Sequence, residues 1–248
     1  MLLKDKVAIV TGASLGIGAS IAEVFAAQGA IVYVLDVDGS GAEAKAAALR
    51  ATGAKAHAFT TDVSKAETVS PPIADAILRY GRIDIVVNNA GIYPRRAFLE
   101  MTEAEWDQMQ NINLKSLYHI SQLVLPHMIE RKSGKIVNIS SVTFFKGMAN
   151  LVHYVAAKGG MIGFSRALAR EMGPHNIHIN CVTPGAIKTE GEVVHADPAA
   201  IAEIVSRQCL NRRIMPDEIA NVCLFLASHL SDGMTGQTLN VDGGLVLY

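Results

Sequence analysis

Seven short runs of apolar and β-branched residues recur along the chain, separated by longer segments with the periodicity of amphipathic helices. The runs are continuously apolar, which is typical of parallel strands that are covered on both faces of a sheet. They span residues 6–12, 30–37, 55–63, 83–91, 134–141, 178–185 and 237–244. Because strands that alternate with helices imply right-handed crossovers, the sequence predicts an α/β fold. We expect a single doubly wound domain over residues 1–248, with a seven-stranded parallel sheet and helices on both faces.

Two segments between the strands carry start signals for helices. Ser64 with Glu67, and Thr102 with Glu105, have the spacing of a capping box, in which a hydroxyl group and a carboxylate bond to the first turn. Prolines at residues 71–72 follow the first box, and proline removes a backbone donor from a helix interior. We therefore expect both boxes to start helices, with a break in the first helix at the prolines.

The charge balance and the cysteines exclude several classes of function. With 22 basic and 23 acidic side chains, the formal net charge of −1 gives no general attraction to nucleic acid or to anionic membranes. Cys181, Cys209 and Cys223 have no C-x-x-C spacing, which favours reduced thiols over a disulfide frame or a zinc site. The chain shows no signal peptide and no apolar run near the roughly 18 residues of a membrane helix. We therefore expect a cytoplasmic protein with a small-molecule partner and no metal.

A glycine-rich loop, residues 11–18, joins the first predicted strand to the first predicted helix. Gly12, Gly16 and Gly18 let the backbone turn tightly and approach a ligand. A helix start also offers unpaired N–H groups to a pyrophosphate. The spacing is not the G-x-G-x-x-G of many dinucleotide sites, and small residues also serve tight helix–strand packing. The loop alone therefore leaves ligand binding and packing as alternatives.

Asp36 closes the second predicted strand, 20 residues after Gly16. A carboxylate at this place accepts hydrogen bonds from a ribose 2′-hydroxyl group and repels a 2′-phosphate. Its neighbours include no arginine that would offset this repulsion. The sequence thus predicts NAD rather than NADP, with a solvated turn residue as the alternative. Asp62, at the end of the third strand, is a candidate partner for the adenine amino group.

Tyr154 and Lys158 lie four positions apart in a helical segment and so share one face. An ammonium group about 4 Å from a phenol, at an effective dielectric constant near 20, supplies about 4 kcal/mol, which equals about 3 units of pKa. That is enough to let Tyr154 exchange protons near neutral pH. Ser141, 13 residues before Tyr154, can donate a hydrogen bond to a substrate oxygen. Asn113 lies inside a predicted helix, which suggests a held water or a backbone kink.

In their order and spacing these motifs resemble the short-chain dehydrogenase/reductase family over essentially the whole chain. The residues that carry the resemblance are 11–18, 88–91, Asn113, Ser141, Tyr154, Lys158, 184–185 and 241–244. The resemblance implies a Rossmann-type fold, a homotetramer and four catalytic residues. Tyr154 would be the general acid/base, Ser141 would orient the substrate oxygen, Lys158 would lower the tyrosine pKa and bind the nicotinamide ribose, and Asn113 would hold a water.

The resemblance also implies a set of NAD contacts along one edge of the sheet and a variable substrate lid at about residues 186–214. The contacts are Gly12, Ser14, Leu15, Gly16, Ile17, Gly18, Asp36, Asp62, Val63, Asn89, Ala90, Gly91, Tyr154, Lys158, Pro184, Gly185, Ile187 and Thr189.

Bulky side chains follow Gly91 and Ser141, where the substrate pocket is expected. The predicted substrate contacts are Tyr93, Thr143, Phe144, Phe145 and Met148. This lining resembles that of the 1-phenylethanol dehydrogenases of the family. It implies NAD(H)-dependent interconversion of a secondary alcohol and a ketone, with an aryl substrate such as 1-phenylethanol or 1-(4-hydroxyphenyl)ethanol. The alternative is that the two phenylalanines only pack beneath the lid.

Two other functions remain open. A 3-oxoacyl-[acyl-carrier-protein] reductase would need a surface for an acidic carrier, which Arg95, Arg96, Arg212 and Arg213 could form. Such an enzyme usually takes NADPH, which Asp36 disfavours. A catalytically idle, nucleotide-sensing protein on the same fold is the third possibility, and the complete set of four catalytic residues argues against it.

Overall fold

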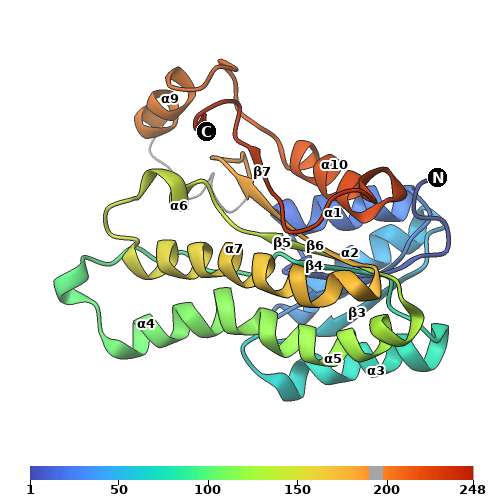
Figure 1. Ribbon diagram of the computed structural model, residues 1–248. Helices are drawn as coiled ribbons and strands as arrows, with labels where there is room; N and C mark the ends of the chain where they lie inside the picture. The colour runs from blue at the N-terminus through green and yellow to red at the C-terminus, as the bar shows by residue number, and fades with distance from the viewer. Residues whose placement is uncertain (190–197, 248) are drawn as a thin grey trace.

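The computed structural model describes residues 1–189 and 198–247, and these residues contain one seven-stranded parallel sheet (Figure 1). The strands are β1 (Val7–Thr11), β2 (Ile31–Asp36), β3 (Ala56–Thr60), β4 (Ile85–Asn88), β5 (Gly134–Ile139), β6 (Ile177–Pro184) and β7 (Thr238–Val241). Their order in the sheet is β3-β2-β1-β4-β5-β6-β7. The chain direction across the sheet reverses between β1 and β4, so this is the crevice where open α/β sheets bind ligands. The predicted doubly wound fold is confirmed.

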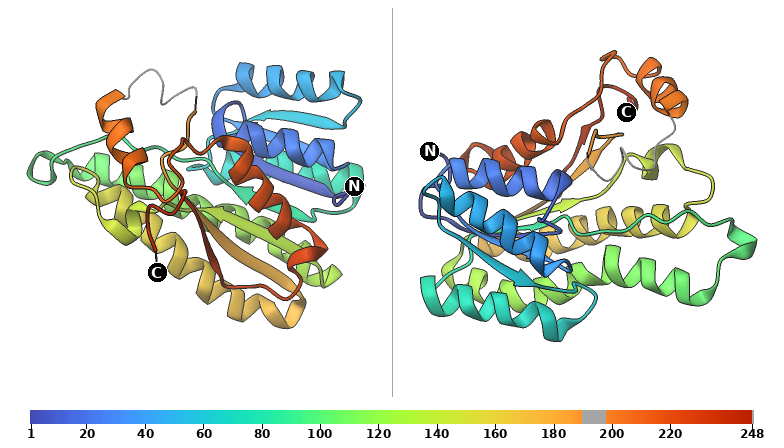
Figure 2. Two further views of the ribbon diagram at one scale, coloured as in Figure 1. Left: turned by 90° about the horizontal axis from the view of Figure 1, so that it is seen from above. Right: turned by 180° about the vertical axis from the view of Figure 1, so that it is seen from behind.

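Helices cover both faces of the sheet (Figure 2). They are α1 (Gly16–Ala27), α2 (Gly39–Ala51), α3 (Ala66–Tyr80), α4 (Glu103–Gln110), α5 (Ser116–Arg131), α6 (Thr143–Lys146), α7 (Val152–Met172), α9 (Pro198–Ser206) and α10 (Pro216–Ala227). Helices α1, α2 and α10 share one hydrophobic cluster with the sheet, and α3, α5 and α7 contribute to a second cluster on the opposite face.

The two clusters explain why the strand runs are continuously apolar. In β1, Ala8 and Val10 belong to the cluster with α1, whereas Val7 and Ile9 belong to the cluster with α3 and α5. All five residues of this strand are buried. Because neighbouring side chains of a strand point to opposite faces, a strand covered on both sides needs apolar residues at every position.

One of the two predicted capping boxes is present. Thr102 Oγ1 accepts a hydrogen bond from Glu105 N at 3.2 Å, and Glu105 Oε2 accepts one from Thr102 N at 2.9 Å, so α4 begins as expected. The prediction for Ser64 is wrong, because α3 begins at Ala66 without a side-chain cap. Ser64 Oγ instead donates to Asp62 Oδ1 at 2.6 Å, which removes it from the helix start.

The predicted break at residues 71–72 is also wrong, because α3 continues through both prolines to Tyr80. Pro72 is buried together with Val69, Ile73 and Ala76, which form the face that the helix presents to the core. Most helical stability in a protein comes from packing of such a face rather than from intrinsic propensity. Burial of this face therefore outweighs the loss of two backbone donors.

Candidate active site

The glycine loop between β1 and α1 uses its three glycines in different ways. Gly12 and Gly16 both have φ near +61°, a conformation that side chains disfavour. A Cβ atom on Gly12 would lie 2.8 Å from the Ala90 Cα, and one on Gly18 would lie 2.1 Å from the Gly12 carbonyl oxygen. Among the described residues, a Cβ on Gly16 would meet only Thr189, at 3.6 Å. Gly12 and Gly18 therefore serve close packing, and Gly16 leaves backbone accessible.

The end of β4 braces this loop. Thr11 Oγ1 accepts hydrogen bonds from the backbone N–H groups of Asn89 and Ala90, each at 3.0 Å. The Asn89 amide donates in return to the carbonyl oxygens of Thr11 at 3.0 Å and Gly12 at 2.9 Å. Asn89 was predicted as a cofactor contact, and in the structure its amide supports the loop. Thr11 was not identified from the sequence as a residue that supports the loop. The signal for it was a hydroxyl group at the end of an otherwise apolar strand.

Asp36 joins the end of β2 to the same loop. Its Oδ2 atom accepts hydrogen bonds from Ser14 N at 3.0 Å and Ser14 Oγ at 2.7 Å, and Oδ1 accepts one from Asp38 N at 3.1 Å. The carboxylate therefore lies beside the loop, where the predicted ribose would sit. The predicted preference for NAD over NADP depends on its negative charge at this point.

A cavity of about 420 Å³ lies between the glycine loop and the segment after β6. Its lining consists of predicted cofactor residues from distant parts of the chain and of side chains next to them. The lining residues are Ser14, Leu15, Gly16, Ala19, Ser20, Glu23, Lys45, Lys188, Thr189, Met215, Pro216 and Asp217. Helix α1 starts here with no side-chain cap and no acidic residue in its first turn, so its N–H groups are available to an anion. These features fit a dinucleotide pyrophosphate.

Asp62 follows β3 and is occupied by its own chain neighbours. Its Oδ1 atom accepts from Ser64 N at 3.0 Å and from Ser64 Oγ, and Oδ2 lies 3.1 Å from Lys65 Nζ. The hydrogen bond from the Ser64 hydroxyl is the main reason that the pKa of Asp62 is lowered. Val63, its predicted companion, is buried in the core. A contact of Asp62 with adenine stays a prediction.

Helix α7 carries Tyr154 and Lys158 on one face, and the end of β5 holds this face in place. Lys158 Nζ lies 5.6 Å from the centroid of the Tyr154 ring and donates a hydrogen bond to the Ile139 carbonyl oxygen at 2.7 Å. Ser140 Oγ donates to the Lys158 carbonyl oxygen at 2.8 Å. Sequence reasoning missed Ser140, although two adjacent serines at the end of a buried strand were a signal. The two side chains therefore lie next to each other, and their catalytic roles stay a prediction.

The acidity of Tyr154 differs from the prediction. Burial is the largest influence on its pKa and raises it to about 12, although a hydrogen bond from the Ser141 side chain acts in the opposite direction. Burial likewise lowers the pKa of Lys158 to about 8. The expectation that Lys158 lowers the pKa of Tyr154 to near neutral pH is therefore wrong for the protein alone. Removing the phenol from water disfavours the phenolate by more than the neighbouring groups favour it.

Asn113 lies in a π-helical turn, Asn111–Lys115, between α4 and α5. Its buried amide accepts a hydrogen bond from Ile92 N at 3.1 Å and donates one to the Ile92 carbonyl oxygen at 3.0 Å. A Cβ atom on Gly91 would lie 2.4 Å from Asn113 Oδ1. The sequence suggested a backbone kink as one reason for an asparagine at this position. The π-helical turn widens the helix locally and provides such an irregularity. Its role in holding a water stays a prediction.

Aromatic side chains flank Tyr154. The Tyr93 ring lies 6.3 Å from the Tyr154 ring, edge to face, and is 59% exposed. Phe144 is also exposed and rests against α7, where a Cβ on Gly159 would lie 2.6 Å from its ring. Phe145, in contrast, packs against the cluster of Leu117, Met161, Ile162 and Cys181. Tyr93 and Phe144 thus remain available to a substrate, while Phe145 contributes to the core, and Met148 is half-buried.

The C-terminal loop holds the segment after β6. Gly185 N donates to the Val241 carbonyl oxygen at 3.1 Å, and a Cβ on Gly185 would lie 2.8 Å from Asp242 Cβ. The Asp242 carboxylate accepts the N–H groups of Gly244 and Val246, each at 2.9 Å. Pro184 ends β6, Ile187 pairs with Ile214, and Ile17 lies in α1. Residues 190–197 of the predicted lid lie outside the described residues.

The four arginines that were considered as a carrier-binding patch are partly neutralised. Arg96 lies 2.7 Å from Glu105, and Arg212 lies 2.7 Å from Glu218. Arg95 is exposed and Arg213 is half-buried. Exposed pairs of this kind contribute little to stability and remain free to exchange partners.

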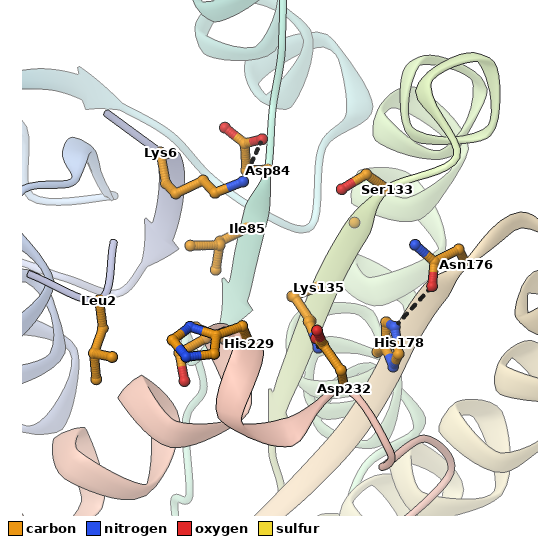
Figure 3. Close-up of a pocket in the computed structure, with 13 residues that line it drawn as sticks. Leu2, Lys6, Asp84, Ile85, Ser133, Lys135, Asn176, His178, His229 and Asp232 are labelled. Carbon is orange, nitrogen blue, oxygen red and sulfur yellow. Dashed lines mark hydrogen bonds and ion pairs between the residues drawn. The ribbon is translucent and has the colours of Figure 1, made fainter. Parts of the chain in front are cut away.

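A second pocket, of about 220 Å³, lies at the amino ends of β4, β5 and β6, far from Tyr154 (Figure 3). Its lysines are already paired: Lys6 lies 3.7 Å from Asp84, and Lys135 lies 2.7 Å from Asp232. Within residues 1–189 and 198–247 no group of His, Cys, Asp and Glu side chains is placed to hold a metal ion. The same residues include no helix that is both long and apolar enough for a membrane span.

Comparisons with known proteins agree with this geometry. The sequence profile of a family described as "Enoyl-(Acyl carrier protein) reductase" matches residues 12–246. A 3-oxoacyl-[acyl-carrier-protein] reductase, FabG, of Chlamydia trachomatis is 43% identical over 245 residues, 98% of each chain. A probable galactose dehydrogenase, GalD, of Rhizobium meliloti is 38% identical over 98% of this chain and 96% of its own. A D-xylose 1-dehydrogenase of Caulobacter vibrioides is 37% identical over the same shares.

Proposed function

Because the chain belongs to the short-chain dehydrogenase/reductase family, we propose that it reduces the ketone of a 3-oxoacyl thioester to a secondary alcohol by hydride transfer. Membership of this family makes the chain an oxidoreductase that uses a nicotinamide cofactor. The observation that carries the proposed substrate is the 43% identity to a 3-oxoacyl-[acyl-carrier-protein] reductase over 98% of both chains. It moves this substrate class ahead of the aryl alcohols that the sequence first suggested.

The side chains around Tyr154 support this chemistry. A bound nicotinamide dinucleotide supplies the hydride that reaches the carbonyl carbon. Tyr154 keeps its proton at neutral pH because its pKa is about 12, so it can donate that proton to the carbonyl oxygen. Ser141 donates a hydrogen bond to the same oxygen, Lys158 binds the nicotinamide ribose, and Asn113 holds a water that returns a proton to Tyr154.

The substrate is tested by comparing acetoacetyl coenzyme A with acetophenone and 4-hydroxyacetophenone as acceptors. We expect kcat/KM with NADH to be at least about tenfold higher for the thioester, since one or two well-placed contacts discriminate by this amount. The measurement is the absorbance of the reduced nicotinamide. If only the aryl ketones are reduced, the aryl ketone becomes the first candidate substrate and the thioester the second. If neither the thioester nor the aryl ketones are reduced with NADH or NADPH, both candidate substrates are contradicted.

An aryl ketone or 1-arylethanol is the second candidate, and a specific observation favours it. Tyr93 leaves an exposed aromatic ring beside Tyr154, and the exposed Phe144 ring rests on the same helix against Gly159. Flat apolar groups stack well against such rings. The same two rings are compatible with the acyl chain of a thioester, which is why this candidate stands second.

We further propose that NAD(H) is preferred over NADP(H). Asp36 places a carboxylate beside Ser14, with both oxygens held by backbone N–H groups. A 2′-phosphate brought to this point would meet a fixed negative charge, whereas a 2′-hydroxyl group would donate to it. The homotetramer and the cytoplasmic location stay predictions.

Replacing Asp36 by serine is expected to raise kcat/KM for NADPH by about tenfold and to lower it for NADH by a similar factor, because the repulsion and the ribose acceptor are removed together. Asp38→Ser is the matched control, since the Asp38 carboxylate caps α2 through Gly41 N at 3.1 Å. The control is expected to leave the ratio of the two kcat/KM values unchanged. An unchanged ratio in Asp36→Ser would refute the role of this carboxylate.

A further inference from the structure

The Ser141 hydroxyl group is held by a neighbour two residues along the chain. Ser141 is 8% exposed and lies two residues after the end of β5. Its Oγ atom lies 3.2 Å from Thr143 N and 3.0 Å from Thr143 Oγ1. The backbone N–H of Thr143 belongs to the first turn of α6, where it has no partner within the helix. Thr143 thus presents two donors to one oxygen atom.

A count of donors and acceptors fixes the direction of these bonds. A hydroxyl oxygen has two acceptor positions and one hydrogen. The backbone N–H of Thr143 can only donate, and the Thr143 hydroxyl group donates to the second acceptor position of Ser141 Oγ. The one hydrogen of Ser141 is then available to one further acceptor at the site. A chain of donors therefore runs from the Thr143 hydroxyl to Ser141 and on to the reacting oxygen.

We propose that Thr143 is a positioning residue that holds the Ser141 hydroxyl group so that its one hydrogen is directed at either the substrate oxygen or Tyr154. The proposal rests on the proposed function, in which Ser141 binds the carbonyl oxygen. It gives Thr143 a role different from the substrate contact that the sequence suggested. Thr143 acts through Ser141 and needs no contact with the substrate.

Two physical effects follow from this arrangement. A free serine side chain samples three staggered rotamers, and two fixed donors restrict it to one. A hydroxyl group that accepts hydrogen bonds is also polarised and becomes a better donor, because hydrogen bonds in a chain strengthen one another. Both effects favour the transition state, where negative charge grows on the substrate oxygen, more than the ground state.

The test compares Thr143→Val, which keeps the shape and the backbone N–H but loses the hydroxyl group, with Thr143→Ser, which retains it. With acetoacetyl coenzyme A and NADH, kcat of Thr143→Val is expected to fall about tenfold, the usual effect of one lost hydrogen bond, with KM changed by less than about twofold. Thr143→Ser is expected to recover kcat to within about twofold. For oxidation of 3-hydroxybutyryl coenzyme A, the rising limb of the pH profile is expected to move to higher pH in Thr143→Val, because the phenolate loses support.

Several outcomes would overturn the proposal. They are an unchanged kcat in Thr143→Val, a change confined to KM, or equal losses in Thr143→Val and Thr143→Ser. A readout independent of turnover is the crystal structure of Thr143→Val, in which Ser141 Oγ is expected to occupy more than one rotamer. A single unchanged rotamer of Ser141 in this variant refutes the positioning role, whether or not the wild-type protein reduces any of the substrates. A wild-type protein that reduces none of them would contradict only the proposed function.

Discussion

Replacing Tyr154 by phenylalanine is expected to lower kcat for ketone reduction by about 1,000-fold, because the variant lacks the only group proposed to deliver the proton. The loss should appear in kcat with both cofactors, whereas the dissociation constant of NADH should change little. Tyr118→Phe is the matched control, since Tyr118 lies on the exposed surface of α5 and is expected to keep wild-type activity. A Tyr154→Phe variant with more than about a tenth of wild-type kcat would refute the proton-donor role.

The pH dependence gives a second view of the same residue. A group with a pKa of about 12 is protonated throughout the neutral range, so the proton donor for reduction is present from about pH 6 to about pH 9. Reduction should therefore be nearly level from about pH 6 to about pH 7 and should fall at higher pH only as the Lys158 ammonium, whose pKa is about 8, loses its proton. Oxidation needs the phenolate, whose population grows as pH rises toward the pKa, so oxidation should increase with pH. The opposite pair of profiles would mean that another group moves the proton.

Replacing Gly18 by alanine is expected to abolish detectable NADH binding and to reduce the free energy of unfolding by about 2 kcal/mol. The added Cβ would lie 2.1 Å from the Gly12 carbonyl oxygen and 2.5 Å from the Asn89 amide nitrogen. Relief of this clash requires the glycine loop to move away from α1, which distorts the proposed pyrophosphate site. Binding is measured by NADH fluorescence and stability by urea denaturation.

Gly163→Ala is the control for this substitution. Gly163 lies inside α7 on its exposed side, and among the described residues a Cβ atom there meets nothing within 4 Å beyond its chain neighbours and its own helix backbone. It is expected to stabilise the protein by about 0.5 kcal/mol through the unfolded chain and to leave NADH binding unchanged. A Gly18→Ala variant that binds NADH as tightly as this control would contradict the close-packed loop.

The strands of the sheet could be predicted from the sequence because a strand that is buried on both faces needs apolar residues at nearly every position. Val7 to Thr11 form one such run, and its limits were located to within about one residue. The prolines of α3 were misread for the converse reason: their effect depends on what the helix packs against, and Val69 and Ile73 supply that packing. Intrinsic propensity is local, and the packing that overrides it is not.

The candidate site shows the same division. Tyr154, Lys158 and Ser141 could be proposed because their spacing along one helix and one strand end is visible in the sequence. The acidity of Tyr154 could not, because it depends on the depth of burial that the folded chain creates. Nor could the partners of Asn89, since Thr11 and Gly12 are far from it in sequence.

The brace between Thr11 and Asn89 has a consequence for how a dinucleotide is captured. Four hydrogen bonds within the protein join the end of β4 to the loop. A preorganised cradle spares an incoming molecule the entropy loss of ordering flexible backbone, so more of the contact energy remains as affinity. Changes that loosen β4 from β1 should therefore weaken affinity and folding in parallel.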